Sequence, residues 1–157
     1  MRVISGIAKG RKLKRVPGDS TRPIMDRVKE NLFNILGPAV PGSRWLDLFA
    51  GTGQVGIEAL SRQAKEVIFV DNVYAAVRTI NDNLRHTRLA EHAQVLKIDA
   101  FRYLDSPTGA PFDFIYVAPP QYKEMWQRVM LILEQMPQKY LGPSGVVVVQ
   151  IDPLEYK

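Results

Sequence analysis

From residue 43 onward, short apolar runs alternate with segments whose apolar residues recur at helical spacing. Residues 45–49 begin the series as a buried strand, and residues 55–61 follow as a helix. Strands and helices that alternate in this way form a parallel sheet covered by helices on both faces. The pattern therefore predicts an α/β protein with a mostly parallel sheet. The further predicted strands are 66–70, 95–98, 112–117 and 145–151, and the further helical segments are 75–84, 101–104 and 125–135.

The first 40 residues follow a different pattern. Residues 2–5 and 12–16 mix β-prone and basic side chains on either side of a glycine-containing turn, which predicts a β-hairpin. Apolar residues then recur at helical spacing up to a glycine–proline pair, which predicts a helix with one apolar face. We therefore divide the chain into an N-terminal extension, residues 1–40, and a main domain, residues 41–157. The apolar positions of the predicted helix are Val28, Leu32, Ile35 and Leu36.

The composition restricts the class of protein. The 157 residues fit one globular domain, and 46% hydrophobic with 24% charged residues argues against wholesale disorder. No apolar run approaches the roughly 20 residues that span a bilayer, and the first residues lack an apolar stretch of signal-peptide length. Cysteine is absent, which removes disulfides, thiol nucleophiles and cysteine-bound metals together. The sequence predicts a cytoplasmic protein without a metal site.

The net charge of +5 is concentrated at the N-terminus. Residues 1–30 hold nine basic and three acidic side chains, whereas the other 127 residues hold twelve basic and thirteen acidic ones. Clustered Lys and Arg favour polyanions, because binding releases the counterions that are condensed on phosphates. A polyanionic partner for this segment is the favoured interpretation, and a solvated basic arm without a partner is the alternative.

The chain ends soon after the last predicted strand. Residues 146–149 are all valine, and an unpaired edge strand of this kind is an aggregation hazard. Two interpretations stay open: something else covers this edge, or further C-terminal strands are missing from the sequence.

A glycine-rich turn lies where the first predicted strand passes into its helix. Gly51, Gly53 and Gly56 follow the order G-x-G-x-x-G, and glycines there let the backbone approach a ligand closely. Asp71 stands 20 residues after Gly51, at the tip of the next strand, where a carboxylate accepts hydrogen bonds from ribose hydroxyls. A cofactor that contains a nucleoside is therefore predicted.

Two further carboxylates bear on which cofactor this is. Asp47 stands at the end of the first strand, where its charge opposes the pyrophosphate of a dinucleotide but suits the α-ammonium of S-adenosyl-L-methionine (SAM). Asp99 follows the third strand, where it can accept a hydrogen bond from an adenine amino group or serve only as a helix N-cap. The three acids together favour SAM over a nicotinamide cofactor.

Long stretches of the chain resemble a known family. DLFAGTGQVGIEALSRQAKEVIFVD is similar to the SAM-binding core of RsmD-type small-subunit ribosomal RNA (guanine-N2)-methyltransferases. MRVISGIAKGRKLKRVPG and TRPIMDRVKENLFNIL resemble that family's opening segments, so the similarity covers nearly the whole chain. The resemblance implies a Rossmann-like SAM-dependent methyltransferase fold. The predicted cofactor-binding residues are Asp47, Phe49, Ala50, Gly51, Thr52, Gly53, Gly56, Asp71, Asn72, Asp99 and Ala100.

The family carries the sequence [D/N]-P-P-[Y/F] after the fourth strand, a signature of methylation at an amino group. Its acidic or amide side chain and the proline carbonyl accept hydrogen bonds from the amine, and its aromatic ring stacks on the base. Here Ala118 has no side-chain acceptor, and the aromatic is displaced by one position. A variant active site is the favoured interpretation, and loss of catalysis with retained RNA binding is the alternative. The predicted catalytic segment is Ala118, Pro119, Pro120, Gln121 and Tyr122.

A guanine amino group reaches a deep pocket only when its base is unpaired or turned outward, and basic side chains then hold the flanking phosphates. We therefore predict a monomeric, SAM-dependent guanine-N2 methyltransferase that acts on small-subunit ribosomal RNA or the assembling subunit, and not at a membrane. The alternatives are a non-catalytic RNA-binding protein and, more remotely, a nicotinamide-dependent oxidoreductase. The predicted RNA-binding residues are Arg11, Lys12, Lys14, Arg15, Arg22 and Arg27.

Overall fold

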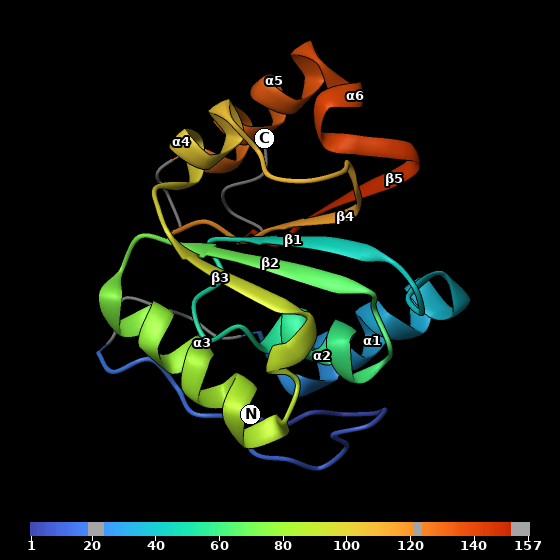
Figure 1. The fold of residues 1–157 in the computed structure, drawn as a ribbon, viewed down its shortest axis with the longest axis vertical. Helices are drawn as coiled ribbons and strands as arrows, with labels where there is room; N and C mark the ends of the chain where they lie inside the picture. Colours follow the sequence, from blue (N-terminus) through green and yellow to red (C-terminus); the bar gives the residue numbers. More distant parts are fainter. Residues whose placement is uncertain (19–23, 121–123, 152–157) are drawn as a thin grey trace.

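The computed structural model describes residues 1–18, 24–120 and 124–151. The strands are β1 (Arg44–Leu48), β2 (Glu66–Asp71), β3 (Ala93–Lys97), β4 (Phe112–Val117) and β5 (Leu141–Val149). They form one sheet in the order β3-β2-β1-β4-β5, in which every neighbouring pair is parallel (Figure 1). The strand order reverses between β1 and β4, and sheets of this type bind ligands at the reversal, outside the carboxyl ends of the strands.

Helices cover both faces of this sheet (Figure 1). The helices on one face are α1 (Asp26–Leu36), α2 (Gln54–Ser61) and α3 (Tyr74–Thr87), and those on the other are α4 (Ala100–Asp105), α5 (Met125–Gln135) and α6 (Pro137–Tyr140). Short 3-10 helices span Gly37–Ala39 and Ala90–His92. Among the described residues, none of the helices combines the length and apolarity that crossing a membrane requires. The predicted α/β fold with a parallel sheet is confirmed.

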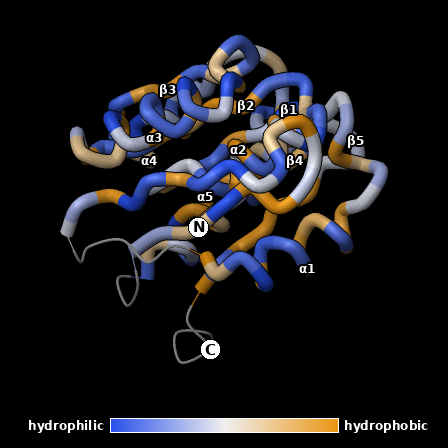
Figure 2. Tube along the Cα trace, turned by 90° about the horizontal axis from the view of Figure 1, so that it is seen from below, coloured by the Kyte–Doolittle hydropathy of each residue, from blue (hydrophilic) through white to orange (hydrophobic). Residues whose placement is uncertain are grey.

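The central strands are buried on both sides. Trp45 and Phe69 pack with α1–α3, whereas the neighbouring residues Leu46 and Ile68 pack with α4–α6. Strands covered on both faces are nearly continuously hydrophobic, which the colouring of the central strands in Figure 2 shows. This burial explains why the apolar runs alone located these strands.

The predicted N-terminal hairpin is present only as a short pairing. Arg2 and Lys12 form an antiparallel bridge, and the Val3 amide donates to the Arg11 carbonyl at 2.9 Å. The prediction that residues 2–5 pair with residues 12–16 is wrong beyond this point. The next backbone amides bond to the helices instead, so the segment lies as an arm, residues 1–16, against α2 and α3. Its side chains that enter the core shared with these helices are Val3, Ala8 and Leu13.

Glu58 of α2 is the residue that holds the start of the arm. Its carboxylate accepts hydrogen bonds from the Ile4 and Ser5 amides at 2.9 and 3.1 Å. The same carboxylate pairs with Lys29 Nζ at 3.6 Å and with Arg62 Nε at 2.8 Å. The side chains of Lys29 and Glu58 are both 0% exposed. A buried pair of charges therefore joins the arm, α1 and α2.

This pair also corrects the predicted apolar face of α1. Two of the four predicted positions, Leu32 and Leu36, are partly buried against the core, but Val28 and Ile35 are 39% and 82% exposed. The residues that are buried are Lys29 and Phe33. The helix is rotated toward Lys29 because that ammonium has to reach Glu58, a partner that apolar spacing does not reveal.

The last strand also begins earlier than predicted. β5 starts at Leu141, directly after the unpredicted helix α6, and its register against β4 shifts between Phe112 and Phe114. The division of the chain at residue 40 stays a prediction.

Candidate functional site

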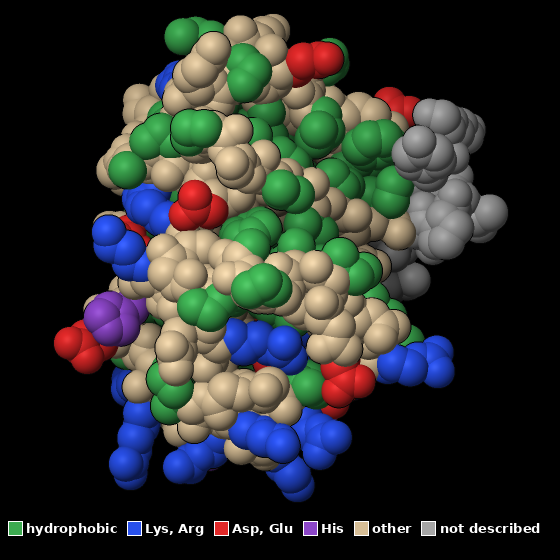
Figure 3. All heavy atoms as spheres, turned by 90° about the vertical axis from the view of Figure 1, so that its right-hand side faces the viewer, with side chains coloured by type: hydrophobic (Ala, Val, Ile, Leu, Met, Phe, Trp, Pro, Cys, Tyr) green, Lys and Arg blue, Asp and Glu red, His purple; other side chains and the backbone are tan. Residues whose placement is uncertain are grey.

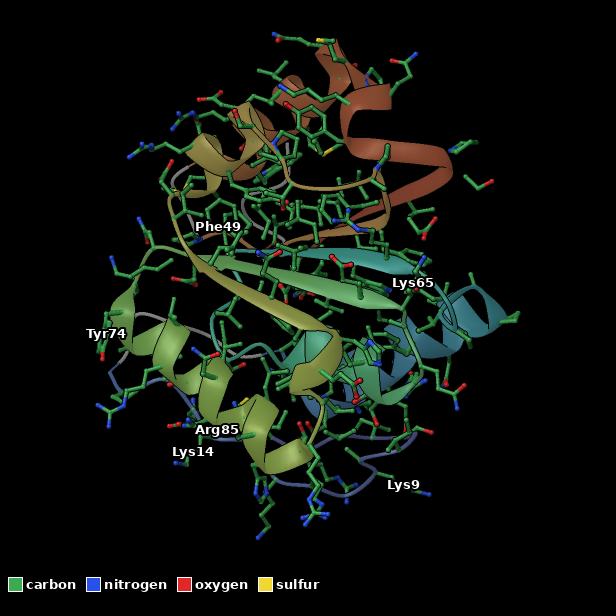
Figure 4. The ribbon with its side chains drawn as sticks, viewed as in Figure 1. Lys9, Lys14, Phe49, Lys65, Tyr74 and Arg85 are labelled. Atoms are coloured by element: carbon green, nitrogen blue, oxygen red, sulfur yellow. The ribbon has the colours of Figure 1, made fainter. Side chains whose placement is uncertain are left out.

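The loop after β1 is bent by backbone conformations that most residues avoid. Gly51 and Gly53 have φ values of 59° and 78°, in the left-handed region that favours glycine. Phe49 shares this region with a φ of 61°, which is uncommon and costly for a bulky residue. Such strain is typical of functional sites. Figure 4 labels Phe49 at the carboxyl end of the sheet.

The third glycine of the motif lets α2 approach the sheet closely. A Cβ at Gly56 would lie 2.3 Å from Phe69 Cε1 and 2.8 Å from Val67 Cγ1. Both neighbours are fully buried in β2 and have no room to retreat. The helix therefore packs against β2 at a distance that only glycine permits.

The change Gly56→Ala is expected to lower the free energy of unfolding by about 1–3 kcal/mol, the usual cost of overpacking a core. Denaturant unfolding measures this loss. The matched control is Gly142→Ala, where the nearest atom would be the Phe112 carbonyl oxygen at 3.8 Å, an ordinary contact. Equal losses in the two variants would contradict the close approach of α2.

Asp47 lies inside the protein at the end of β1. Its Oδ2 accepts a hydrogen bond from the Gly56 amide at 3.1 Å, and its side chain is buried. Burial raises the pKa of this carboxyl to about 8, and the nearby charge of Asp71 adds to the rise. Tyr116 is its neighbour on β4, and burial likewise raises the pKa of that phenol. A cationic ligand group beside Asp47 would restore the ionised form.

Asp71 ties together the loops that follow β1 and β2. Its Oδ2 accepts from the Gly51 amide and its Oδ1 from the Val73 amide, both at 2.9 Å. Each carboxylate oxygen can accept a second hydrogen bond. The side chain is half-buried, so ribose hydroxyls can reach it.

Asp99 is the N-cap of α4. Its Oδ2 accepts from the Phe101 and Arg102 amides at 3.0 and 3.2 Å, which confirms the capping interpretation. It also lines a cavity together with Asp71. Its contact with an adenine amino group stays a prediction.

Two small cavities meet at Phe49, which lines both of them. The first has a volume of about 90 Å³ and lies between β2, α4 and α5. The second has a volume of about 50 Å³ and lies beside Asp47. They are called the adenosine cavity and the methionine cavity below, after the parts of SAM that the sequence predicts for them. The adenosine cavity is lined by Phe49, Val70, Asp71, Asn72, Asp99, Ala100, Phe101, Pro120 and Met125. The methionine cavity is lined by Ile24, Asp47, Phe49, Ala50, Thr52, Gln54, Val55, Tyr116 and Ala118.

Sequence reasoning missed several of these lining residues. Tyr116 falls within a predicted strand, and only the register of β4 against β1 places it opposite Asp47. Ile24 precedes α1 and is brought in from a distance, because its carbonyl accepts from Gln54 Nε2 at 3.0 Å. Phe101 and Met125 stand at the starts of α4 and α5, the helix ends that face the carboxyl edge of the sheet.

The predicted catalytic segment is divided between the two cavities. Ala118 lines the methionine cavity, Pro119 is buried, and Pro120 lines the adenosine cavity. Gln121 and Tyr122 lie outside the described residues. The chain therefore leaves β4 between the two predicted halves of the cofactor site.

Most of the predicted RNA-binding side chains are exposed. Arg15 lines a hollow that shares Ile24 with the methionine cavity, so it lies next to the cofactor site. Figure 3 shows Lys and Arg side chains gathered at the arm end of the molecule. Arg22 lies outside the described residues. The exposed residues of the predicted set are Arg11, Lys12, Lys14, Arg15 and Arg27.

Asn83 of α3 connects the arm to the cofactor loop. Its Oδ1 accepts from the Lys14 amide at 2.7 Å, and its Nδ2 donates to the Lys14 carbonyl at 3.1 Å. The same Nδ2 donates to the Thr52 carbonyl at 3.1 Å. Asn83 is buried, so these bonds are shielded from water.

The sheet order, with acids at the carboxyl ends of three neighbouring strands, is that of a Rossmann-like α/β protein with the fold of SAM-dependent methyltransferases. An RNA methyltransferase from Salinibacter ruber, solved with S-adenosyl-L-homocysteine, has this fold with a TM-score of 0.68 over 83% of this chain and 79% of its own, at 18% identity. The chain belongs to the family described as Conserved hypothetical protein 95, whose model matches residues 1–155.

Relatives within this family are similar over nearly the whole chain. YlbH of Bacillus subtilis is 47% identical over 97% of this chain and 83% of its own length. Ribosomal RNA small subunit methyltransferase D of Haemophilus influenzae is 34% identical over 97% of this chain and 79% of its own. The structure of yhhF from Escherichia coli matches with a TM-score of 0.84 and 33% identity, over 98% of this chain and 82% of its own. The resemblance to RsmD-type methyltransferases is confirmed.

Proposed function

We propose that this protein transfers a methyl group from SAM to guanine N2 in small-subunit ribosomal RNA. The observation that carries the proposal is the buried Asp47 carboxyl, which faces a cavity beside the glycine loop. We infer the small-subunit RNA as substrate from the name of a relative, ribosomal RNA small subunit methyltransferase D of Haemophilus influenzae. We expect the protein to act in the cytoplasm as a monomer.

The side chains around the two cavities fit SAM. In this proposal Asp47, which lines the methionine cavity, pairs with the α-ammonium, and Asp71, which lines the adenosine cavity, accepts from the ribose hydroxyls. Asp99 lines the adenosine cavity with Phe101, and in this proposal it accepts from the adenine amino group. Bound SAM supplies an activated methyl group on a sulfonium.

The acceptor side of the site differs from the usual amino-methylation motif at Ala118. In this proposal the Ala118 and Pro119 carbonyls accept hydrogen bonds from the guanine amine, since neither residue has a polar side chain. Tyr122 then stacks on the base. The chain holds the amine next to the methionine cavity, which Ala118 lines.

Transfer of labelled methyl groups tests the proposal. Purified small-subunit RNA and small subunits that lack the modification are incubated with the protein and labelled SAM, and the modified base is identified. We expect N2-methylguanine. A protein that binds both SAM and the RNA without transferring the label is instead the non-catalytic RNA-binding protein, and one that binds neither ligand contradicts both functions.

The change Tyr122→Ala is expected to slow methyl transfer by about 10- to 100-fold, since stacking of a base on an aromatic ring contributes about 1–3 kcal/mol. SAM affinity should stay within about twofold, because Tyr122 is assigned to the acceptor base. Single-turnover transfer and calorimetric titration measure the two effects. The control Tyr122→Phe keeps the ring and should keep the rate. Equal losses of transfer and SAM binding would refute this role.

A further inference from the structure

A basic hollow lies between the arm and α3 at the surface, and it shares no lining residue with either cofactor cavity. Its volume is about 430 Å³, and it is open to solvent. Three of its six lining residues come from the arm, which lies within the basic residues 1–30, and the other three come from α3. The lining residues are Lys12, Leu13 and Lys14 from the arm, and Asp82, Arg85 and His86 from α3.

The cations in this basic hollow are held side by side. Lys14 Nζ lies 3.6 Å from Asp82 Oδ2, and Arg85 pairs with the same carboxylate. The side chains of Lys14 and Arg85 are 72% and 73% exposed, so the shared carboxylate brings them together without burying them. Exposed pairs of this kind are weak. Lys12 adds a third exposed cation, which leaves the hollow with an excess of positive charge.

The floor of the basic hollow is anchored to α3. Leu13 is buried between the two cationic residues of the arm, and Asn83 bonds to both backbone groups of Lys14. The positions of Lys12 and Lys14 relative to α3 are therefore set before any ligand arrives. A prearranged set of cations binds phosphates at a lower entropic cost than a mobile basic tail does.

Helix α3 runs from the cofactor site to this basic hollow. It begins at Tyr74, three residues after Asp71 of the adenosine cavity, and Arg85 lies about 16 Å further along the helix at 1.5 Å per residue. Tyr74, Arg78 and Arg85 recur at helical spacing and are all exposed. Figure 4 shows Tyr74 at one end of α3, with Arg85 and Lys14 near the other.

We propose that the basic hollow binds phosphates of the RNA strand that enters the cofactor site, and that the exposed face of α3 guides this strand. The inference rests on the proposed function, and it adds a contribution from α3 to the binding predicted for the arm. RNA is the fitting partner because several exposed cations on an open surface match the repeating phosphates of a nucleic-acid backbone. The proposed function also brings an RNA strand to the cofactor site, where α3 begins.

The test compares Arg85→Ala with the control Lys65→Ala, which removes an exposed cation directly before β2, at the end of the sheet opposite to Phe49 (Figure 4). Affinity for purified small-subunit RNA is measured at several salt concentrations. Arg85→Ala is expected to weaken binding several-fold and to reduce the slope of log affinity against log salt by roughly 0.7, the value for one lost phosphate contact on a single strand. Lys65→Ala should leave the slope unchanged, and SAM affinity should be the same in both variants.

Arg85 also stands in the last turn of α3, where a cation stabilises the helix. Melting temperatures and the variant Arg85→Lys separate this role from RNA binding, because lysine keeps the charge and should keep the salt slope. The proposal is overturned if Arg85→Ala binds naked RNA as the parent does, or if Lys65→Ala loses as much. It is also overturned if the loss occurs only with assembled subunits, which would point to a protein partner. A parent protein that binds no RNA would instead overturn the proposed function.

Discussion

Replacement of Glu58 by alanine is expected to lower the free energy of unfolding by about 3–5 kcal/mol, the usual cost of removing one partner from a buried ion pair. The change removes the carboxylate of α2 that pairs with the buried Lys29 ammonium. It also removes the acceptor of the Ile4 and Ser5 amides. Burial already lowers the pKa of Lys29, against the pull of Glu58 and Asp26. Without Glu58 that pKa should fall further. Denaturant unfolding measures the loss, and hydrogen exchange should show faster exchange at the Ile4 and Ser5 amides.

Glu30→Ala is the matched control, because this glutamate is exposed on α1 next to Lys29. It removes the same charge and should change stability by no more than about 0.5 kcal/mol. If Glu58→Ala were as mild as Glu30→Ala, the buried pair would not hold the arm. The double change Lys29→Met, Glu58→Leu should recover only the part of the loss that comes from the unpaired Lys29 charge, because the Ile4 and Ser5 amides stay without their acceptor.

Binding of SAM is expected to weaken by up to about tenfold per pH unit as the pH falls from about 7.5 to about 6. The pKa of Asp47 in the free protein is raised to about 8, mainly because burial disfavours the charged form. Pairing with the α-ammonium requires the ionised form, so binding below this pKa must release a proton. Calorimetry in two buffers of different ionisation enthalpy should therefore detect close to one proton released per SAM near neutral pH.

Asp47→Asn is the control for this pH dependence. Its amide oxygen can still accept from the Gly56 amide, so the loop should keep its shape. The variant should bind SAM more weakly, and its affinity should hardly change with pH in this range. Proton release that persists in Asp47→Asn would assign the titration to another group and remove Asp47 from the ammonium site.

The sheet could be predicted because its information is local. Strands β1, β2 and β4 are covered on both faces, so most of their residues are apolar and the charged ones lie mainly near the strand ends. The glycine loop was equally readable, since its left-handed φ values at Gly51 and Gly53 require the residue type that the sequence shows. Asp71 followed from its place at the end of the neighbouring strand.

The extension could not be predicted in the same way, because its partners are distant in sequence. The hairpin is shorter than expected because Glu58 and Asn83 take over backbone amides that a longer ladder would have used. The face of α1 was misjudged because its main buried contact is ionic. In the site itself, Ile24 lines the methionine cavity because its carbonyl accepts a hydrogen bond from Gln54, a contact that no local sequence pattern predicts.

The three bonds of Asn83 also determine how the basic segment can respond to a load. Lys14 and Thr52 are fastened to the same carboxamide. A nucleic-acid strand that pulled the basic segment away from α3 would have to break the two bonds between Asn83 and Lys14. The same pull would strain the bond between Asn83 and the glycine turn. The N-terminal segment is thus fixed to α3 at Asn83 and does not hang free. A force that pulls on Lys14 therefore also acts on Thr52 in the glycine turn.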